Sequence, residues 1–545
     1  MKTTCLSAAI VAAIPARVTF AAMFRNTRTS LCAVAISLAA LTQVSGQPVI
    51  TTQPQSQTNV VSSSVTLSVA ATGTPPLFYQ WRRQSSNVTG QTNDALVIAS
   101  LQNSNVGNYT VTITNPQGAV TSAIAFVRIV LPPSITGQPT NGVGDVGGSA
   151  TFSVVASGSA PLTYQWRWNT NVLAGQTNRT LVLTNLQLAH RGQYSVVVSN
   201  SFGSATSQMA GLGLYITMAP RFEPALSISR GAGGLAVRWQ ENGQLERASG
   251  VTGPWQSLTA ASPFTNSPIG AMAFFRVKHP RPVRVYLPSR YDAQSPAPLI
   301  IALHGHSPNG GTGVENYFKL QPLAESRGFV YCYPDGLLDS SGRRFWNATT
   351  TCCDLFGAGV DDAGYLRGLI EGIGSALAIE RKRVYLLGHS NGGFMSYRMA
   401  CDYADVIAGI ASLAGTTTLG ETNCRPSQPV NVLHIHGTAD EFVPYAGGGR
   451  RTNAAGVVSI RTGAMQVVQL WAGFNGSQDL VMDAAPSLDL DLSVAGLDTI
   501  VTRYGTHPAG GDVELWAIQN ATHFPVFSPE FSPRMVDWLL ARPKP

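Results

Sequence analysis

The apolar run Val384-Tyr385-Leu386-Leu387 leads into Gly388-His389-Ser390-Asn391-Gly392, which has the pattern G-x-S-x-G. The run is typical of a buried strand, and residues 393–400 that follow are typical of a helix. A serine on such a turn is held in a strained conformation with its hydroxyl exposed. Glycines flank it because side chains at Gly388 and Gly392 are expected to clash with the neighbouring strand and helix. This stretch predicts a nucleophilic Ser390 in an α/β domain.

The composition is typical of a multidomain globular protein that is rich in turns. A chain of 545 residues suggests roughly three to four domains. Only 12% of the residues are charged, and 54 glycines and 33 prolines favour β modules. The net charge of +7 is modest, and no run of Lys and Arg or basic stripe with interleaved aromatics is present. We therefore expect no nucleic-acid partner.

The first 46 residues are predicted to direct export. Arg25 and Arg28 precede the apolar patch 31–41, and small residues Val44-Ser45-Gly46 follow it, as in a cleavable signal peptide. Met23 is an alternative start of the chain. A membrane anchor is the competing interpretation, but the patch is short for a bilayer span and no later segment is long and apolar enough. We expect a secreted or periplasmic protein without a membrane span.

Cysteine usage agrees with export. Cys5 and Cys32 lie in the export region, and Cys332 lies in a strand-like run where we expect a buried free thiol. The other four can pair in three ways; they are Cys352, Cys353, Cys401 and Cys424. Because a bond between adjacent cysteines strains the backbone, we expect Cys352 and Cys353 to pair with Cys401 and Cys424. A zinc site is the weaker alternative, since no C-x-x-C or histidine spacing supports it.

Two repeats with an offset of 85 residues follow the export region. Tyr79-Gln80-Trp81 recurs as Tyr164-Gln165-Trp166, and Gly107-Asn108-Tyr109 recurs as Gly192-Gln193-Tyr194. Short strands with alternating polarity and turns between them predict β-sandwiches.

The repeats resemble immunoglobulin-like domains in the strand tryptophan and in the Gly-x-Tyr corner. The usual inter-sheet cysteines are replaced by Val69 and Val111 in the first repeat and by Val154 and Val196 in the second. These modules are therefore expected to be held by packing alone. We assign them to residues 47–131 and 132–216 and expect spacers rather than sugar-binding modules.

The rest of the chain divides into a small β module and an α/β domain. Residues 217–282 contain strand-like runs at 235–239 and 273–277 and a turn at Gly253-Pro254-Trp255. From residue 283 to 545, apolar strands such as 298–303, 430–436 and 513–518 alternate with amphipathic helices, which implies a mostly parallel sheet. Asp362 is predicted to cap one of these helices.

A serine nucleophile needs a base, a carboxylate that orients the base, and donors for the oxyanion. Asp440 and His523 each follow a predicted strand downstream of Ser390, in the Ser-Asp-His order of α/β-hydrolases. The oxyanion donors are expected to be the backbone N–H groups of Asn391 and of His306, in the loop after the 300–303 strand.

Each role in this set has competitors. Asp361, Asp362 and Asp405 precede or follow helices and are interpreted as caps. Among the histidines, His436 is expected to stabilise the turn before Asp440, and His507 lies in a loop rich in Gly and Pro.

The α/β segment resembles the secreted esterases grouped as polyhydroxybutyrate-depolymerase-like, which include feruloyl and acetylxylan esterases. The matching motifs cover most of residues 283–450; they are Leu303-His304-Gly305, Tyr333-Pro334-Asp335-Gly336, Trp346-Asn347-Ala348, Cys352-Cys353, Val360-Asp361-Asp362, Gly388-His389-Ser390-Asn391-Gly392-Gly393, Met399-Ala400-Cys401 and residues 434–440. The resemblance implies a serine carboxylesterase with the triad Ser390, Asp440 and His523. It also places Trp346 near the substrate pocket, with a core tryptophan as the alternative, and makes His304 and His389 further candidates for substrate contact.

Two departures from the family pattern affect the expected substrate. Ser477 stands where a late cysteine is usual, and the histidine motif continues Phe524-Pro525-Val526 instead of Thr-Trp-Pro-Gly. Both fall in the part that supplies the base and the pocket wall.

The sequence therefore predicts a secreted serine esterase that needs no metal or cofactor. Feruloyl or acetyl esters of plant cell-wall polysaccharide are the first substrate hypothesis, because spacer modules suit an insoluble polymer. A polyester such as polyhydroxybutyrate is the second, and a peptide is a distant third. A non-catalytic surface-binding protein is the alternative of another class.

Overall fold

The computed structural model describes residues 46–220, 227–231, 234–238, 244–248, 256–258, 264–266, 274–278, 281–349, 352, 361–417, 424–452 and 458–545. The chain divides into two compact units, Met1–Ile129 and Val130–Pro545. The predicted export segment and Cys353 lie outside the described residues.

The first unit is a β-sandwich. Its strands are β1 (Val49–Thr52), β2 (Gln57–Val60), β3 (Val65–Ser68), β4 (Ala70–Thr72), β5 (Phe78–Arg83), β6 (Ser86–Asn87), β7 (Ala95–Ile98), β8 (Gly107–Asn115), β9 (Gly118–Thr121) and β10 (Ala125–Val130), with the short 3-10 helix Asn103–Asn105. Trp81 is fully buried and donates to the carbonyl of Asn93, and the Tyr109 hydroxyl donates to the carbonyl of Asn105. Val69 and Val111 are buried where the inter-sheet disulfide of other immunoglobulin domains would lie, so packing replaces the covalent link.

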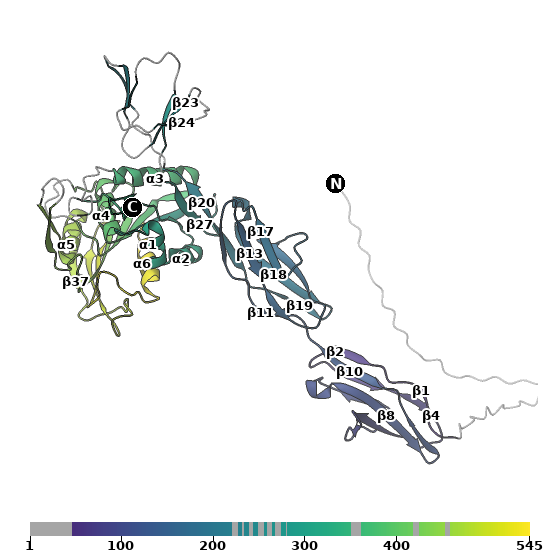
Figure 1. Cartoon of the computed structure of the whole chain (residues 1–545). Coiled ribbons are helices and arrows are strands. Elements are labelled where there is room, and N and C mark those ends of the chain that lie inside the picture. The colour runs from purple at the N-terminus through teal and green to yellow at the C-terminus, as the bar shows by residue number, and fades with distance from the viewer. Residues whose placement is uncertain are drawn as a thin grey trace, which may run out of the picture. The chain divides into compact units, whose positions relative to one another are not determined.

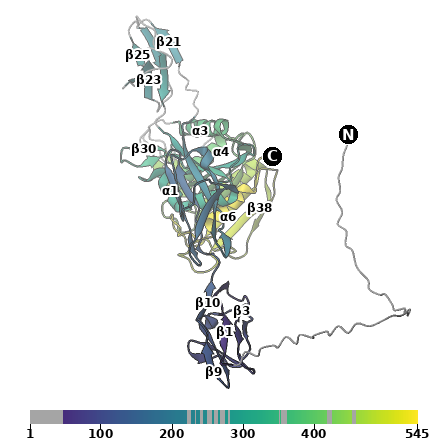
Figure 2. The same ribbon diagram turned by 90° about the vertical axis from the view of Figure 1, so that its right-hand side faces the viewer.

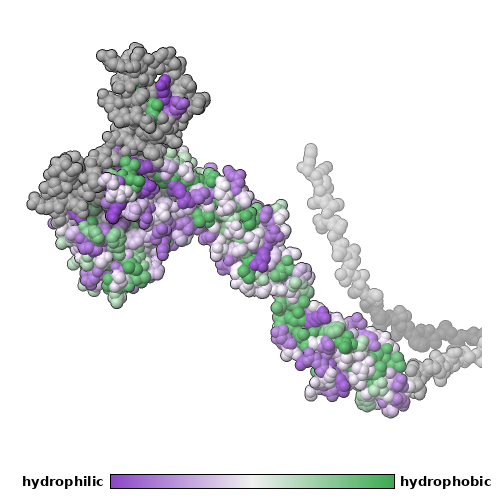
Figure 3. All heavy atoms as spheres, viewed as in Figure 1, coloured by the Kyte–Doolittle hydropathy of each residue, from purple (hydrophilic) through white to green (hydrophobic). Residues whose placement is uncertain are grey.

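The second unit begins with a copy of this sandwich. Its strands are β11 (Ser134–Gly137), β12 (Gly142–Asp145), β13 (Ser149–Ser153), β14 (Val155–Ser157), β15 (Thr163–Trp168), β16 (Asn171–Val172), β17 (Thr180–Thr184), β18 (Gly192–Asn200), β19 (Gly203–Thr206) and β20 (Ala210–Met218), with the 3-10 helix Leu188–His190. Trp166 and Tyr194 repeat the contacts of their counterparts, on the carbonyls of Asn178 and His190. Polar and apolar residues are interspersed on the face of both sandwiches that Figure 3 shows.

The last strand of the second sandwich also belongs to the α/β domain. The start of β20 pairs with β18, from Ala210↔Tyr194 to Leu212↔Gly192. Its end pairs antiparallel with β27 (Val283–Leu287), from Leu214↔Leu287 to Met218↔Val283. The sheets of the two domains are therefore continuous, and this repeat is not a spacer linked by a flexible segment (Figure 1).

Side chains reinforce this junction. The hydroxyls of Tyr215 on β20 and Tyr331 on β29 (Val330–Cys332) are 2.7 Å apart and buried. The amide of Gln193 donates to Ser289 over 2.5 Å, and the hydroxyl of Tyr286 donates to Glu325 over 2.9 Å.

The small β module lies in sequence between β20 and β27. It has two three-stranded sheets, made of β21 (Ser227–Gly231), β22 (Gly234–Arg238) and β25 (Phe264–Asn266), and of β24 (Gln256–Ser257), β23 (Gln244–Ala248) and β26 (Phe274–Lys278) (Figure 2). β22 and β26 coincide with the strands predicted near 235–239 and 273–277. Because Met218 pairs with Val283, the module is an insertion between two adjacent strands of one sheet.

The α/β domain continues the sheet in the order β27, β29, β28 (Ala297–Leu303), β32 (Ile379–His389), β33 (Gly409–Leu413), β34 (Asn431–Gly437), β39 (Val513–Ile518), β38 (Thr499–Thr506) and β37 (Gln478–Met482). The pairs from β29 to β39 are parallel, and the edges are antiparallel. Two short hairpins lie outside this sheet, formed by β30 (Leu337–Leu338) with β31 (Arg344–Phe345) and by β35 (Gly448–Thr452) with β36 (Val458–Arg461).

Alternating side chains of the central strand divide the core into two layers. Leu299, Ile301 and Leu303 on β28 pack in one layer, and Ile300 and Ala302 pack in the other. The first layer is covered by α3 (Asp362–Ala376), α4 (Asn391–Asp402) and α5 (Ala464–Asn475), and the second by α1 (Gly310–Phe318), α2 (Leu320–Arg327) and α6 (Phe531–Leu540) (Figure 1). The predicted buried parallel sheet, covered on both faces, is confirmed.

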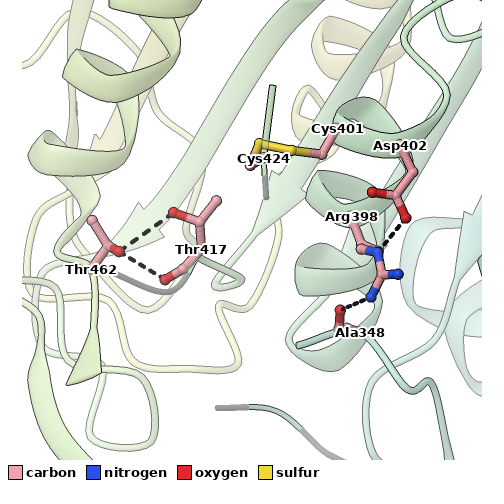
Figure 4. Close-up of a disulfide and its surroundings, with 7 residues drawn as sticks. All are labelled: Ala348, Arg398, Cys401, Asp402, Thr417, Cys424 and Thr462. Carbon is pink, nitrogen blue, oxygen red and sulfur yellow. Dashed lines mark hydrogen bonds and ion pairs between the residues drawn. A yellow bond between two sulfur atoms is a disulfide. The ribbon is translucent and has the colours of Figure 1, made fainter. Parts of the chain in front are cut away.

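The predicted disulfide pairing is wrong. Cys401, near the end of α4, is bonded to Cys424, with Cα atoms 5.3 Å apart (Figure 4). Neither is left for Cys352 or Cys353, and Cys352 is itself disulfide-bonded. The fold brings the chain after β33 back beside the end of α4, a contact that sequence spacing does not reveal. Cys332 is a buried free thiol, as predicted.

The shared strand leads to a prediction about truncation. A chain that starts at residue 219 loses β20 and leaves the edge of β27 unpaired, whereas a chain that starts at residue 130 keeps the whole second unit. We expect the melting temperature of the shorter chain to fall by roughly 10 °C relative to that of the longer one. Differential scanning fluorimetry of both truncated chains tests this, and midpoints within about 2 °C of each other would contradict it.

Candidate active site

The backbone at Ser390 is strained. Ser390 joins β32 to α4 with φ 53° and ψ −118°, a conformation that a residue with a Cβ adopts at a cost of about 1–3 kcal/mol. Its N–H donates to the carbonyl of Leu413 over 2.8 Å, and its carbonyl accepts from the N–H of Phe394 over 3.0 Å. These bonds on both sides hold the turn in place.

The flanking glycines are required by close packing. A Cβ at Gly388 would overlap the carbonyl of Gly392, and a Cβ at Gly392 would overlap the carbonyl of Leu303 at the end of β28. The predicted clashes with the neighbouring helix and strand are therefore present. Because only hydrogen fits at Gly388 and Gly392, glycine at both positions lets the turn that carries Ser390 lie against the sheet.

Ser390, His523 and Asp440 form a hydrogen-bonded chain. The Ser390 Oγ is 2.9 Å from Nε2 of His523, and Nδ1 of His523 is 2.7 Å from Oδ2 of Asp440. Asp440 follows β34 and His523 follows β39, and these parallel neighbours end together at Gly437↔Ile518. His523 and Asp440 are buried, while Ser390 is half-buried and remains accessible.

The Asp440 carboxylate is fully engaged. Its Oδ1 accepts from the backbone N–H groups of Phe442 and Val443 over 2.8 and 2.7 Å, and Oδ2 lies 3.3 Å from Nε2 of His436 as well as beside His523. Burial acts to raise the pKa of Asp440, but hydrogen bonds from His436 and His523 outweigh it and lower that pKa. Asp440 is therefore an anion that orients the imidazole and stabilises its protonated form.

A buried chain of hydrogen-bonded side chains leads from His436, which contacts Asp440, to Tyr397. The hydroxyl of Tyr397 donates to Nδ1 of His434, and Nε2 of His434 lies 3.1 Å from Nδ1 of His436. Nε2 of His436 lies 2.7 Å from the carbonyl of Val443, so these partners fix the tautomers of both histidines. The expectation that His436 stabilises the turn agrees with this geometry.

The competing carboxylates lie elsewhere. Asp361, not Asp362, caps α3, since its side chain accepts from the N–H of Gly364. Asp362 is the first residue of that helix and forms a buried ion pair with Arg281 over 2.7 Å. Asp405 pairs with Arg367.

Both residues expected to donate to the oxyanion lie near the serine, Asn391 as the next residue and His306 through its neighbour Gly305. Asn391 is the first residue of α4, so its N–H has no acceptor within the helix. His306 lies in the loop after β28, and a Cβ added at the preceding Gly305 would be 3.3 Å from the Cβ of Ser390. The imidazole of His306 contacts Asp339, with Nε2 2.6 Å from Oδ2, which anchors this loop.

The side chain of Asn391 has a role that the sequence did not predict. Its Oδ1 accepts from the N–H of Trp346 over 2.7 Å, and its Nδ2 donates to the Trp346 carbonyl over 2.9 Å. The indole of Trp346 in turn donates to the carbonyl of His304 over 3.1 Å. Hydrogen bonds thus join the turn at Ser390, the segment around Trp346 and the loop after β28.

The three residues expected to contact the substrate are buried in the structure. Trp346 is fully buried, and His304 is 1% exposed and accepts from the N–H of Gly336. His389 is buried and donates from Nε2 to the carbonyl of His523 over 2.9 Å. All three hold backbone segments around the serine, and burial lowers the pKa of His304 to about 4 and of His389 to about 3, which keeps both neutral.

The described part of the chain offers no metal cluster and no membrane-spanning helix. No group of three or more His, Cys, Asp or Glu side chains there is arranged to hold a metal ion. No helix there is long and apolar enough to cross a bilayer.

Comparison with known families agrees with this architecture. The immunoglobulin domain family matches residues 47–115 and 132–200, and the phospholipase/carboxylesterase family matches residues 358–464, which contain Ser390 and Asp440. The chain is therefore multidomain, with immunoglobulin domains followed by an α/β-hydrolase domain.

Several curated proteins are similar to parts of the chain. Feruloyl esterase B of Piromyces equi is 31% identical over 36% of this chain and 36% of its own length. The bifunctional acetylxylan esterase/xylanase XynS20E of Neocallimastix patriciarum is 31% identical over 30% of this chain and 22% of its own length, and feruloyl esterase D of Neurospora crassa is 29% identical over 30% and 54%. The chain thus spans between about a fifth and about half of these relatives.

The packing of the turn predicts the effect of one methyl group. Gly392→Ala is expected to lower the free energy of unfolding by roughly 3 kcal/mol, because the added Cβ overlaps the Leu303 carbonyl. Gly374→Ala on α3 is the matched control, since a Cβ there meets nothing within 4 Å and should stabilise the helix by about 0.5–1 kcal/mol. Urea unfolding measures both, and equal stabilities of the two variants would contradict the packing argument.

The buried titratable groups predict acid sensitivity. Burial lowers the pKa values of His304, His389 and His434 in the folded protein. As the pH falls below about 6.5, these histidines are protonated in the unfolded chain but stay neutral in the folded one. The free energy of unfolding therefore decreases. Glu315 acts in the opposite direction, because burial raises its pKa to about 7 and it gains its proton first in the folded state. The three histidines against Glu315 give a loss of at most about 2.5 kcal/mol per pH unit near pH 5.5, because burial also raises the pKa of Asp362, which acts in the same direction as Glu315.

Urea unfolding between pH 7 and pH 5 measures this slope. His389→Gln should reduce it by about one proton, or roughly 1.2 kcal/mol per pH unit. A stability that stays level over this range would be inconsistent with buried neutral histidines.

Proposed function

We propose that this chain is a secreted serine carboxylesterase that acts on feruloyl or acetyl esters of plant cell-wall polysaccharide. The observation that carries the proposal is the hydrogen-bonded chain from Ser390 through His523 to Asp440 at a strained strand-to-helix turn. A serine hydroxyl with a base and an orienting carboxylate is the arrangement that acyl transfer requires.

The proposed reaction has two steps. The Ser390 Oγ attacks the ester carbonyl carbon while its proton passes to Nε2 of His523, and the N–H groups of Asn391 and His306 stabilise the oxyanion. The bond to the alcohol oxygen then breaks, and His523 gives that oxygen its proton. In the second step His523 takes a proton from water, the hydroxide attacks the acyl-enzyme, and Ser390 regains its proton as the acid leaves.

The substrate class is supported by the relatives named as feruloyl and acetylxylan esterases. Export is supported by the disulfide between Cys401 and Cys424, since such bonds persist in oxidising compartments. A polymeric substrate is inferred from the presence of immunoglobulin domains on an exported esterase.

Replacing the nucleophile tests the mechanism. Ser390→Ala is expected to lower kcat for 4-nitrophenyl acetate by at least about 10³-fold, and Asp440→Asn by about 10²–10⁴-fold. Ser375→Ala on α3, whose hydroxyl donates to the carbonyl of Gly372 in the same helix, is the control and should keep full activity. Full activity of Ser390→Ala would refute the mechanism.

A panel of methyl ferulate, acetylated xylan and polyhydroxybutyrate then tests the substrate class. Release of ferulate or acetate at higher kcat/KM than that for the polyester is expected. Hydrolysis of polyhydroxybutyrate alone would favour the competing polyester hypothesis.

A further inference from the structure

Two exposed phenylalanines border the histidine of the candidate active site. The ring of Phe524 lies 4.8 Å from the ring of His523, and the ring of Phe442 lies 5.2 Å from it. The two phenyl rings are 6.1 Å apart, nearly perpendicular, and each side chain is 57% exposed. A pair of large exposed apolar rings beside a reactive group is typical of a surface that binds a ligand.

The backbone on which each ring stands is held by hydrogen bonds. The N–H of Phe442 donates to Asp440 over 2.8 Å, and its carbonyl accepts from the Arg461 guanidinium. The N–H of Phe524 donates to the Thr522 hydroxyl over 3.3 Å, and the carbonyl of the next residue, Pro525, accepts from Tyr317 over 3.1 Å. Rings on an ordered backbone lose little entropy when a ligand binds.

The apolar surface continues away from the rings. Val526 is 56% exposed and Leu492 is 61% exposed, and the N–H of Leu492 donates to the Val526 carbonyl over 2.7 Å. Val526 is two residues from Phe524 and is hydrogen-bonded to Leu492, so exposed apolar side chains extend beyond the two rings, which suits a substrate that extends beyond the ester.

The chemistry of the reaction decides which end of the ester meets this strip. When the tetrahedral intermediate collapses, Nε2 of His523 gives its proton to the leaving alcohol, so the alcohol oxygen lies on the His523 side of the reacting carbon. The acyl carbon is bonded to Ser390, and the oxyanion faces Asn391 and His306. Groups attached to the alcohol therefore pass the rings that border His523.

We propose that Phe442 and Phe524 form a platform that binds the sugar ring carrying the ester, so that the alcohol and not the acyl group determines specificity here. The inference rests on the proposed esterase function. The C–H face of a sugar ring is apolar, and it packs against the electron-rich face of a phenyl ring while its hydroxyls stay in water. Methyl esters have no such ring and cannot use the platform.

A pair of substrates with one acyl group tests the proposal. The kcat/KM for a feruloyl ester of arabinose is divided by the kcat/KM for methyl ferulate, in the full chain and in Phe442→Ala, Phe524→Ala and the double variant. Each single variant should lower this ratio about fivefold through the KM of the sugar ester, and the double variant should lower it further. Phe524→Trp should keep or raise the ratio, because the larger ring preserves the stacking surface.

The control is Met482→Ala on the edge strand β37, where the side chain is 61% exposed and the ratio should not change. Equal losses for both esters would place the rings on the acyl side and overturn the proposal, as would a ratio that no phenylalanine variant changes. If the unaltered chain hydrolyses methyl ferulate and the sugar ester but the ratio is insensitive, only the platform fails. If it hydrolyses neither these esters nor 4-nitrophenyl acetate, the proposed function fails and the platform with it.

Discussion

The contact between the start of α4 and the end of β28 is the constraint on which the candidate site depends. Gly392 lies so close to the Leu303 carbonyl that no side chain fits, and this approach forces Ser390 into its strained conformation. The same approach brings Gly305 against the serine and places Asn391 at the start of the helix. A single point of close packing thus positions the hydroxyl and both expected oxyanion donors, and the hydrogen bonds at Leu413 and Phe394 offset the strain.

Around this contact, buried polar side chains form hydrogen bonds mainly with backbone groups. Asn391 binds both backbone groups of Trp346, His389 binds the carbonyl of His523, and His304 binds the N–H of Gly336. Each of these side chains is buried, so losing its hydrogen bond would leave a desolvated polar group without a partner. Each also fixes the position of a backbone segment near the serine. The reacting groups are few, but their positions depend on a larger set of neutral buried side chains.

The sequence predicts those features that follow from local pattern and chain order. Ser390, Asp440 and His523 were expected because each follows a strand, and parallel strands end at one edge of the sheet. The sequence leaves two positions open for Trp346, the substrate pocket or the core, because its surroundings include Asn391, which is 45 residues away and binds its backbone. The disulfide prediction failed for the same reason: adjacency of Cys352 and Cys353 is visible in the sequence, whereas the return of the chain to Cys401 is not. The sequence marks Phe524 only as a departure from a family pattern and does not mark Phe442, since exposure is a property of the fold.

The shared strand has the widest consequence for how the chain is organised. A spacer is useful because it moves independently, yet β20 carries the ladder of the second sandwich at one end and that of the hydrolase at the other. Moving one domain against the other would break these pairs and separate the buried hydroxyls of Tyr215 and Tyr331. The second sandwich is therefore part of the hydrolase's structural unit and closes an edge of its sheet that would otherwise be open to pairing with other chains. Its sequence resembles that of the first repeat, but sheet continuity gives it a different physical role.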